Sequence, residues 1–114
     1  MELTTFSIAA HEPTTGSFGV AVSTARPCVG SLVPFVSLNG AIATQARVNT
    51  ELGRQGILLV DQNISIQTAL KTLLDDDHEA ARRQIHGITA EGRFVFSGPL
   101  CVDWFGHREG DGYT

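Results

Sequence analysis

The sequence predicts an α+β domain in which two helices pack on one face of a largely antiparallel sheet. Three observations lead to this prediction. Short runs of β-branched, small and apolar residues fill the first part of the chain, a helical period takes over after Arg47, and extended character returns after Arg83. A chain of 114 residues has room for one hydrophobic core. We therefore expect a single domain over residues 1–114.

Three hairpins are predicted from strand and turn signals. Residues 6–10 and 18–25 flank a turn in which Pro13 presets the backbone and Gly16 supplies a left-handed position. Residues 31–38 and 41–45 flank Asn39-Gly40, a strong hairpin-turn signal. Residues 84–89 and 93–97 flank the turn 90–92, and residues 100–102 are expected to form a short strand.

The first predicted helix begins near Asn49 and Thr50, which are acceptable N-caps. Gly53 and Gly56 each weaken it by about 1 kcal/mol relative to Ala. We therefore expect these glycines to let the helix approach the sheet closely.

The second helix is predicted from a capping Ser65 and from apolar residues at 66, 69, 70, 73 and 74, which repeat with helical spacing. It ends at three consecutive aspartates, residues 75–77. Consecutive carboxylates do not converge on one point, and calcium loops alternate their ligands. The three aspartates are therefore interpreted as a solvated helix end and not as a metal site.

The apolar runs of the strands are too continuous for a sheet that faces water on one side. No segment of the sequence is an evident cover for the second face of that sheet. We expect either self-association into a homo-oligomer or a further part of the domain to cover it.

Composition excludes several classes of partner. The net charge is −4 and no basic cluster occurs, which argues against binding to nucleic acid or to an anionic membrane surface. No apolar run is long enough for a membrane span, and the first residues lack the pattern of a secretory signal, so a cytoplasmic protein is expected. In that compartment Cys28 and Cys101 should be reduced, although a disulfide between them is an alternative.

Neither a metal nor a cofactor is expected. The four histidines have no ligand-like spacing, neither cysteine belongs to a CxxC motif, and no phosphate loop or nucleotide fingerprint occurs.

The candidate catalytic residues are Thr5 and Thr4, at the start of the first predicted strand. A Thr at the very first position of a chain can use its own α-amine as a base to activate its hydroxyl, which is the chemistry of N-terminal-nucleophile hydrolases. The alternative is that these hydroxyl residues are there for their β-propensity.

The candidate substrate-binding residues are more scattered. Thr44 and Gln45 end a buried strand and could donate to a substrate carbonyl, or could satisfy the backbone of their own strand end. Arg47 and Arg83 could anchor a substrate carboxylate, or lie on the surface. His107 could belong to a polar pocket, or to a surface loop.

Many spaced blocks resemble a known family: residues 5–10, 15–16 with 19–23, 29–30 with 33–34, 43–46, 52–53 with 56, 83–84 and 106–108. The blocks are similar to those of an uncharacterised bacterial family, domain of unknown function 1028, assigned to the Ntn-hydrolase-like superfamily. The resemblance implies a four-layer αββα sandwich, of which this chain would be the first half to two thirds. It also implies that Thr5 corresponds to the nucleophile.

Two hypotheses about function follow. The first is an Ntn-type amidohydrolase that acts on a small amide or peptide bond without a cofactor. Because Met1 to Thr4 precede Thr5, it requires a cut at the Thr4–Thr5 bond; a cut after Leu3 would expose Thr4 instead. The second is a non-catalytic, self-associating module or a truncated relative with the same fold.

Overall fold

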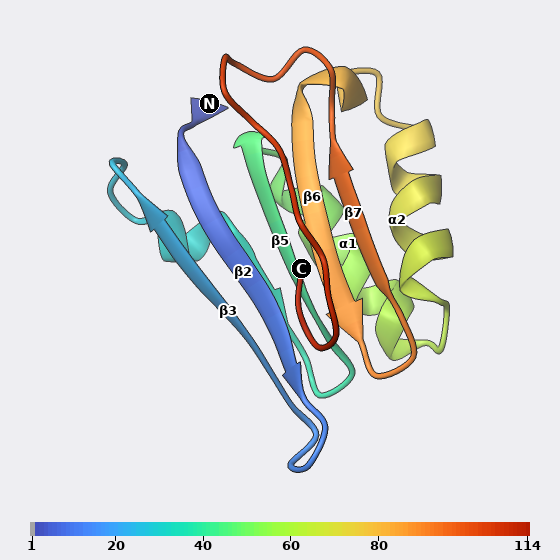
Figure 1. The fold of residues 1–114 in the computed structure, drawn as a ribbon. Coiled ribbons are helices and arrows are strands. Elements are labelled where there is room, and N and C mark those ends of the chain that lie inside the picture. The colour runs from blue at the N-terminus through green and yellow to red at the C-terminus, as the bar shows by residue number, and fades with distance from the viewer. Residues whose placement is uncertain (1) are drawn as a thin grey trace.

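The computed structural model describes residues 2–114 and the side chains of residues 4–114. Two sheets stack face to face, and two helices cover the outer face of the larger sheet (Figure 1). The larger sheet has the order β1-β5-β6-β7, with β4 also paired to β5, and every pairing is antiparallel. The smaller sheet is the antiparallel hairpin β2-β3. The predicted α+β class, with two helices and antiparallel sheets, is therefore confirmed.

The strands of the larger sheet are β1 (Glu2–Leu3), β4 (Pro34–Val36), β5 (Gly40–Arg47), β6 (Arg83–Thr89) and β7 (Arg93–Ser97). The smaller sheet contains β2 (Thr5–Glu12) and β3 (Ser17–Thr24). All three predicted hairpins are present, since β2 pairs with β3, β4 with β5 and β6 with β7.

The helices are α1 (Thr50–Asp61) and α2 (Ile66–Asp75). The predicted N-caps form, because the side chain of Asn49 accepts from the amide of Glu51 and that of Ser65 accepts from the amide of Thr68. Apolar residues of both helices pack on the larger sheet in one buried cluster: Leu52, Val60, Ile66, Leu70 and Leu74 from the helices, and Ile42 and Ile85 from the strands.

Gly56 allows α1 to approach both α2 and the sheet. A methyl group at this position would lie 2.8 Å from Cδ2 of Leu70 and 2.9 Å from Cδ1 of Ile42. The glycine prediction is confirmed here, and close packing accounts for a residue that is otherwise unfavourable in a helix.

The second face of the larger sheet is covered by β2 and β3, which corrects the expectation that this chain has no cover for it. The two sheets meet through small residues, and Ala9, Ala41 and Ala43 are fully buried between them. The face that lacks a cover is instead the outer face of the β2-β3 hairpin, where Phe6 is 74% exposed.

The last described residues run beside β2. The amide of Ala9 donates to the carbonyl of Thr114 at 3.0 Å, and the amide of Thr114 donates to the carbonyl of Ala9 at 2.9 Å. The amide of His11 donates to the carbonyl of Gly112 at 2.9 Å. Strand β2 is therefore flanked by β3 on one edge and by residues 112–114 on the other (Figure 1).

Three local predictions are wrong. Residues 29–31 form the 3-10 helix η1 (Val29–Ser31), so the strand predicted from residue 31 is shortened to β4. Residues 100–102 lie in turn and irregular structure, where the amide of Leu100 donates to the carbonyl of Ala81. Asp77 is not solvated: it lies just before η2 (Ala80–Arg82), and its side chain is only 7% exposed.

Candidate functional site

The chain crosses from one sheet to the other at Thr4, between β1 on the larger sheet and β2 on the smaller one. Thr5 is the first residue of β2, is half-buried and lies directly opposite Thr24 of β3. The Thr5 hydroxyl donates to Oγ1 of Thr24 at 3.2 Å, and the Thr24 hydroxyl donates to the carbonyl oxygen of Thr4 at 2.9 Å. Three hydroxyl residues therefore meet at the crossing.

Ser7 shares with Thr5 the face of β2 that points toward the larger sheet, because side chains alternate along a strand. Its Oγ lies 2.7 Å from Oε1 of Gln45 on β5 and 2.6 Å from Nε2 of His86 on β6. Both distances are those of strong hydrogen bonds. Ser7 thus ties β2 to two strands of the opposite sheet.

These contacts belong to a longer chain of hydrogen bonds, which we call the inter-sheet network. Gln45 Nε2 donates to Gln84 Oε1 at 3.2 Å, Gln84 Nε2 donates to Ser97 Oγ at 2.9 Å, and Ser97 Oγ lies 2.9 Å from Nδ1 of His107. At the other end, Nδ1 of His86 lies 2.8 Å from the hydroxyl of Thr114. The members are Ser7, Gln45, Gln84, His86, Ser97, His107 and Thr114.

His86 is the buried ionisable group of this network, with 8% of its surface exposed. Burial disfavours the charged imidazolium, and the nearby His107 adds to this effect, so the pKa of His86 is lowered from 6.5 to about 4. The neutral ring fits the surrounding donors: Ser7 donates to Gln45, Nε2–H of His86 donates to Ser7, and Thr114 donates to Nδ1.

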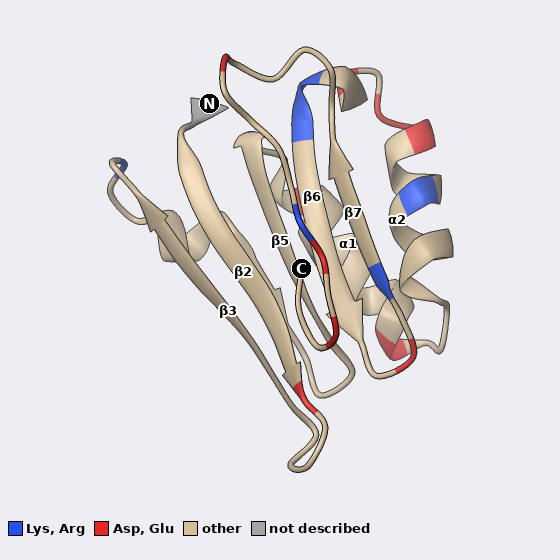
Figure 2. Cartoon of the chain, in the orientation of Figure 1, with Lys and Arg blue, Asp and Glu red and all other residues tan. Residues whose placement is uncertain are grey.

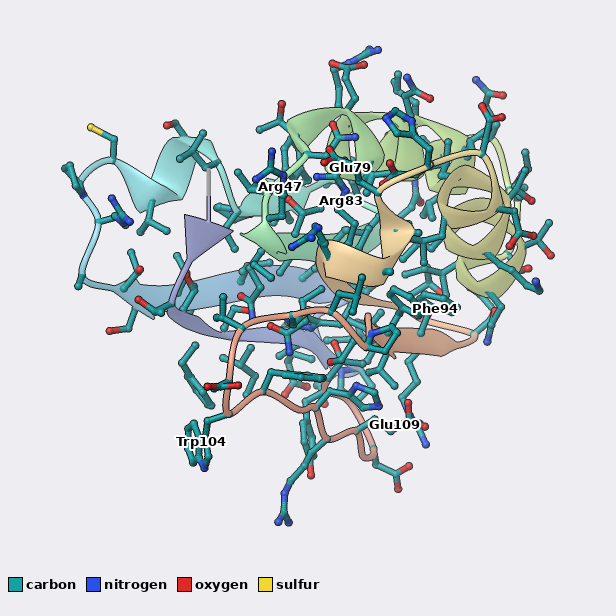
Figure 3. All side chains as sticks on the ribbon, turned by 90° about the horizontal axis from the view of Figure 1, so that it is seen from above. Arg47, Glu79, Arg83, Phe94, Trp104 and Glu109 are labelled. Atoms are coloured by element: carbon teal, nitrogen blue, oxygen red, sulfur yellow. The ribbon has the colours of Figure 1, made fainter. Side chains whose placement is uncertain are left out.

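Arg83 lies at the start of β6 in a separate ionic cluster (Figure 3). Its guanidinium is 2.7 Å from Asp77, 3.3 Å from Glu79 and 2.7 Å from the backbone carbonyl of Arg47. The hydrogen bond from Arg83 lowers the pKa of Asp77, and the same bond raises the pKa of Arg83. These contacts occupy the guanidinium, so a substrate carboxylate would have to displace them.

Arg47 is more open than Arg83. Its side chain is 42% exposed and forms a 3.2 Å ion pair with Glu79. Because β1 pairs Glu2 with Arg47, this residue lies at the same end of the sheets as the crossing at Thr4.

Two cavities lie around the turns that end β2 and β6. The larger has a volume of about 460 Å³ and is lined by residues that include His11, Asn39, Gln67 and Glu91. The smaller has a volume of about 190 Å³ and shares His11 and Glu91 with it. Neither cavity is lined by Thr5, Ser7 or His86.

Comparison with known proteins shows which family this is. The sequence matches the model of a family of unknown function, DUF1028, over residues 5–114. The chain belongs to the DUF1028 family. Its fold is similar to the crystal structure of protein SPO2555 from Silicibacter pomeroyi, assigned to the same family, with a TM-score of 0.89 and 30% sequence identity. The match covers 98% of this chain and 50% of that one, so the chain spans about half the length of that protein. No match is found among curated proteins.

The DUF1028 chain brings only some of the predicted binding residues together. Gln45 contacts Ser7 between the sheets. Thr44 is 1% exposed, and its hydroxyl donates to the carbonyl of Leu32 at 3.3 Å. His107 is exposed and joins the network through Ser97.

Among the described side chains, no group of three or more His, Cys, Asp or Glu residues is arranged to hold a metal ion. No helix of the same residues is long and apolar enough to cross a membrane.

Sequence reasoning missed Thr24, Ser7 and His86 as members of a site. Their signal in the sequence is weak. His86 lies in a run of apolar and small residues, and Ser7 occupies an inward position of an alternating strand. A polar residue at such a position needs a partner inside the protein, but the partner lies 79 positions away in the sequence.

Proposed function

We propose that this DUF1028 protein is an N-terminal-nucleophile amidohydrolase that acts on a small amide or peptide bond. Thr5 is the nucleophile, and it becomes competent when the Thr4–Thr5 bond is cut. The observation that carries the proposal is the position of Thr5: it begins β2 at the crossing between the sheets, with its hydroxyl hydrogen-bonded to Thr24. The family match also begins at Thr5, so the residues removed by the cut lie outside it.

The reaction needs only groups that Thr5 carries after the cut. The hydroxyl oxygen attacks the carbonyl carbon of the substrate, and the free α-amine, whose ordinary pKa is about 8, takes the hydroxyl proton. The proton then passes to the leaving amine as the carbon–nitrogen bond breaks. Water hydrolyses the resulting ester, with the same amine as the base, and restores the Thr5 hydroxyl.

Arg47 is the residue we assign to substrate binding. Arg47 lies at the crossing and is partly exposed, so its guanidinium can reach an anionic group of a substrate. Buried contacts engage Gln45, Thr44 and Arg83, and we assign these three residues to the stability of the fold.

Ser7 and His86 also resemble a nucleophile and its base, since 2.6 Å separates Oγ from Nε2. Two observations favour a structural role. Burial lowers the pKa of His86 to about 4, which makes it a weak base near neutral pH. In addition, Ser7 Oγ also contacts Gln45, and Nδ1 of His86 contacts Thr114, so both side chains are held within the network.

The test combines N-terminal sequencing with an amidase screen of the full chain. We expect a fraction of molecules to begin at Thr5 and to hydrolyse small amides. Thr5→Ala should abolish both properties while costing about 1 kcal/mol of stability for one lost hydrogen bond. Ser23→Ala, on the outer face of the same hairpin, is the matched control. Hydrolysis that survives Thr5→Ala would overturn the assignment, and a chain that begins at Thr4 would move the nucleophile to that residue.

A second candidate function is a self-associating module, and the outer face of the β2-β3 hairpin favours it. Phe6 is 74% exposed and Ile8 38% exposed on this face. The two strands carry no Lys, Arg or Asp, and Glu12 at the end of β2 is their one acidic residue (Figure 2). We expect the occupant to be a second copy of this chain.

Sedimentation velocity tests the module. If the chain self-associates through this face, Phe6→Ser should shift the oligomer toward monomer. Leu38→Ser should leave the oligomer unchanged, because Leu38 is 93% exposed but lies elsewhere on the molecule. A wild-type chain that stays monomeric over the concentration range would rule the module out.

A further inference from the structure

The Thr24 hydroxyl touches both groups that must react if the chain cuts itself before Thr5. It accepts a hydrogen bond from the Thr5 hydroxyl at 3.2 Å and donates one to the carbonyl oxygen of Thr4 at 2.9 Å. The first group is the proposed nucleophile. The second is the carbonyl of the bond that has to break.

The fold explains why this hydroxyl is in place. Thr24 is the last residue of β3, and the hairpin register places it directly opposite Thr5. Hydrogen bonds between facing threonines are common in sheets. The bond to Thr4 is different, because Thr4 lies between β1 and β2, where the chain leaves one sheet for the other.

We propose that Thr24 relays the proton in a self-cleavage of the Thr4–Thr5 bond. This inference rests on the proposed function, because the cut is what supplies the free amine of Thr5. The Thr5 oxygen bonds to the carbonyl carbon of Thr4. Its proton passes to Thr24 Oγ1 while the proton of Thr24 passes to the carbonyl oxygen, so no net charge develops. Hydrogen-bond donors aimed at such an oxygen commonly supply a large share of rate enhancement in acyl transfer.

The remaining steps balance without another protein group. The carbon–nitrogen bond breaks, and the proton on the former carbonyl oxygen passes to the nitrogen, which leaves an ester between Thr4 and the Thr5 oxygen and a free α-amine on Thr5. Water then hydrolyses the ester. The products are a peptide that ends in the carboxyl group of Thr4 and a chain that begins with Thr5.

A purely structural role for Thr24 gives different expectations. If its hydroxyl only braces the crossing, a substitution should change stability and leave the rate of cleavage unaltered. The rate and the stability must therefore be measured on the same samples.

The experiment follows the intact mass of freshly purified full chain over time in wild type, Thr24→Val, Thr24→Ser and Ser23→Ala. Valine keeps the shape and the β-propensity of threonine but removes the hydroxyl. We expect Thr24→Val to slow the loss of residues 1–4 at least about a hundredfold, the usual effect of removing one such donor. Thr24→Ser should restore cleavage, Ser23→Ala should match wild type, and all variants should show the same circular dichroism spectrum.

Parallel amidase assays separate this inference from the proposed function. Cleavage of Thr24→Val at the wild-type rate would overturn the relay and leave Thr5 as nucleophile. A wild-type chain that never cuts itself would overturn the relay, and it would overturn the proposed nucleophile as well, because the free amine of Thr5 would not form. Thr24-dependent cleavage without amide hydrolysis would support the relay and count against the hydrolase.

Discussion

Buried His86 should make the fold sensitive to mild acid. The pKa of His86 is lowered from 6.5 to about 4, mainly because the ring is removed from water. Well above pH 6.5 the ring is neutral in both the folded and the unfolded chain. As the pH falls from 6.5 toward 4, the unfolded chain binds a proton that the folded chain excludes, so the free energy of unfolding falls. Each pH unit in this window costs about 1.4 kcal/mol, and the loss over the whole window is about 3 kcal/mol.

The assay is urea denaturation at a series of pH values between 7 and 4, followed by circular dichroism. His86→Gln removes the titrating ring, and its free energy of unfolding should be nearly independent of pH across most of this range. His78→Gln, at an exposed position, is the matched control and should keep the wild-type slope. Because the carboxylates are the same in all three chains, the comparison isolates the imidazole. Equal slopes for wild type and His86→Gln would refute the reasoning.

Two further predictions concern packing and charge, and both are measured by urea denaturation. Asp77→Asn removes the closest carboxylate of the Arg83 guanidinium, whose side chain is 7% exposed, and should lower the free energy of unfolding by about 3 kcal/mol. Asp76→Asn, at the exposed neighbouring position, should change the free energy of unfolding by no more than about 0.5 kcal/mol. Equal effects of the two substitutions would contradict the buried ion pair. Gly87→Ala places a methyl group 2.7 Å from the carbonyl oxygen of Ala41 and should cost about 1–3 kcal/mol. The methyl group of Gly19→Ala meets no atom within 4 Å, so this substitution should leave the free energy of unfolding unchanged or raise it. If Gly19→Ala destabilised the fold more than Gly87→Ala, the packing argument would be refuted.

Local signals in the sequence were sufficient for the helices and hairpins. Asn49 and Ser65 satisfy amides within their own first turns, and the Pro13 to Gly16 turn joins strands that are neighbours in the chain. Such interactions depend on residues a few positions apart, so their pattern is readable without the fold. The pairing of β2 with β3 and of β6 with β7 follows from the same local chemistry.

The stacking of two sheets could not be read in this way. Apolar runs predicted strands but not which sheet each strand joins, and the cover of the larger sheet was already present in the first predicted hairpin. Asp77 was interpreted as solvated because its neighbours in the sequence are acidic, whereas its partner Arg83 is brought to it by the start of β6. The run of residues 31–38 predicts a strand, but η1 occupies the beginning of this segment and β4 is confined to Pro34–Val36.

The sequence predicts only those members of the candidate site that lie at or near the ends of strands. Thr5 and Gln45 were named from their positions at a strand start and a strand end. Thr24 became visible only when the hairpin register placed it opposite Thr5, and His86 only when the stacking of the sheets placed it against Ser7. Contacts between layers depend on the three-dimensional arrangement, which a linear pattern of residue types does not encode.

The pairing of β2 with residues 112–114 has a consequence for the order of folding. The β2-β3 hairpin is local and can form early, but the edge of β2 that bonds to Thr114 stays open until nearly all the described chain has been synthesised. An open strand edge can recruit strands from other chains. Nascent chains of this protein should therefore be most prone to aggregation before Gly112 and Thr114 emerge from the ribosome, and least prone once these residues have closed that edge.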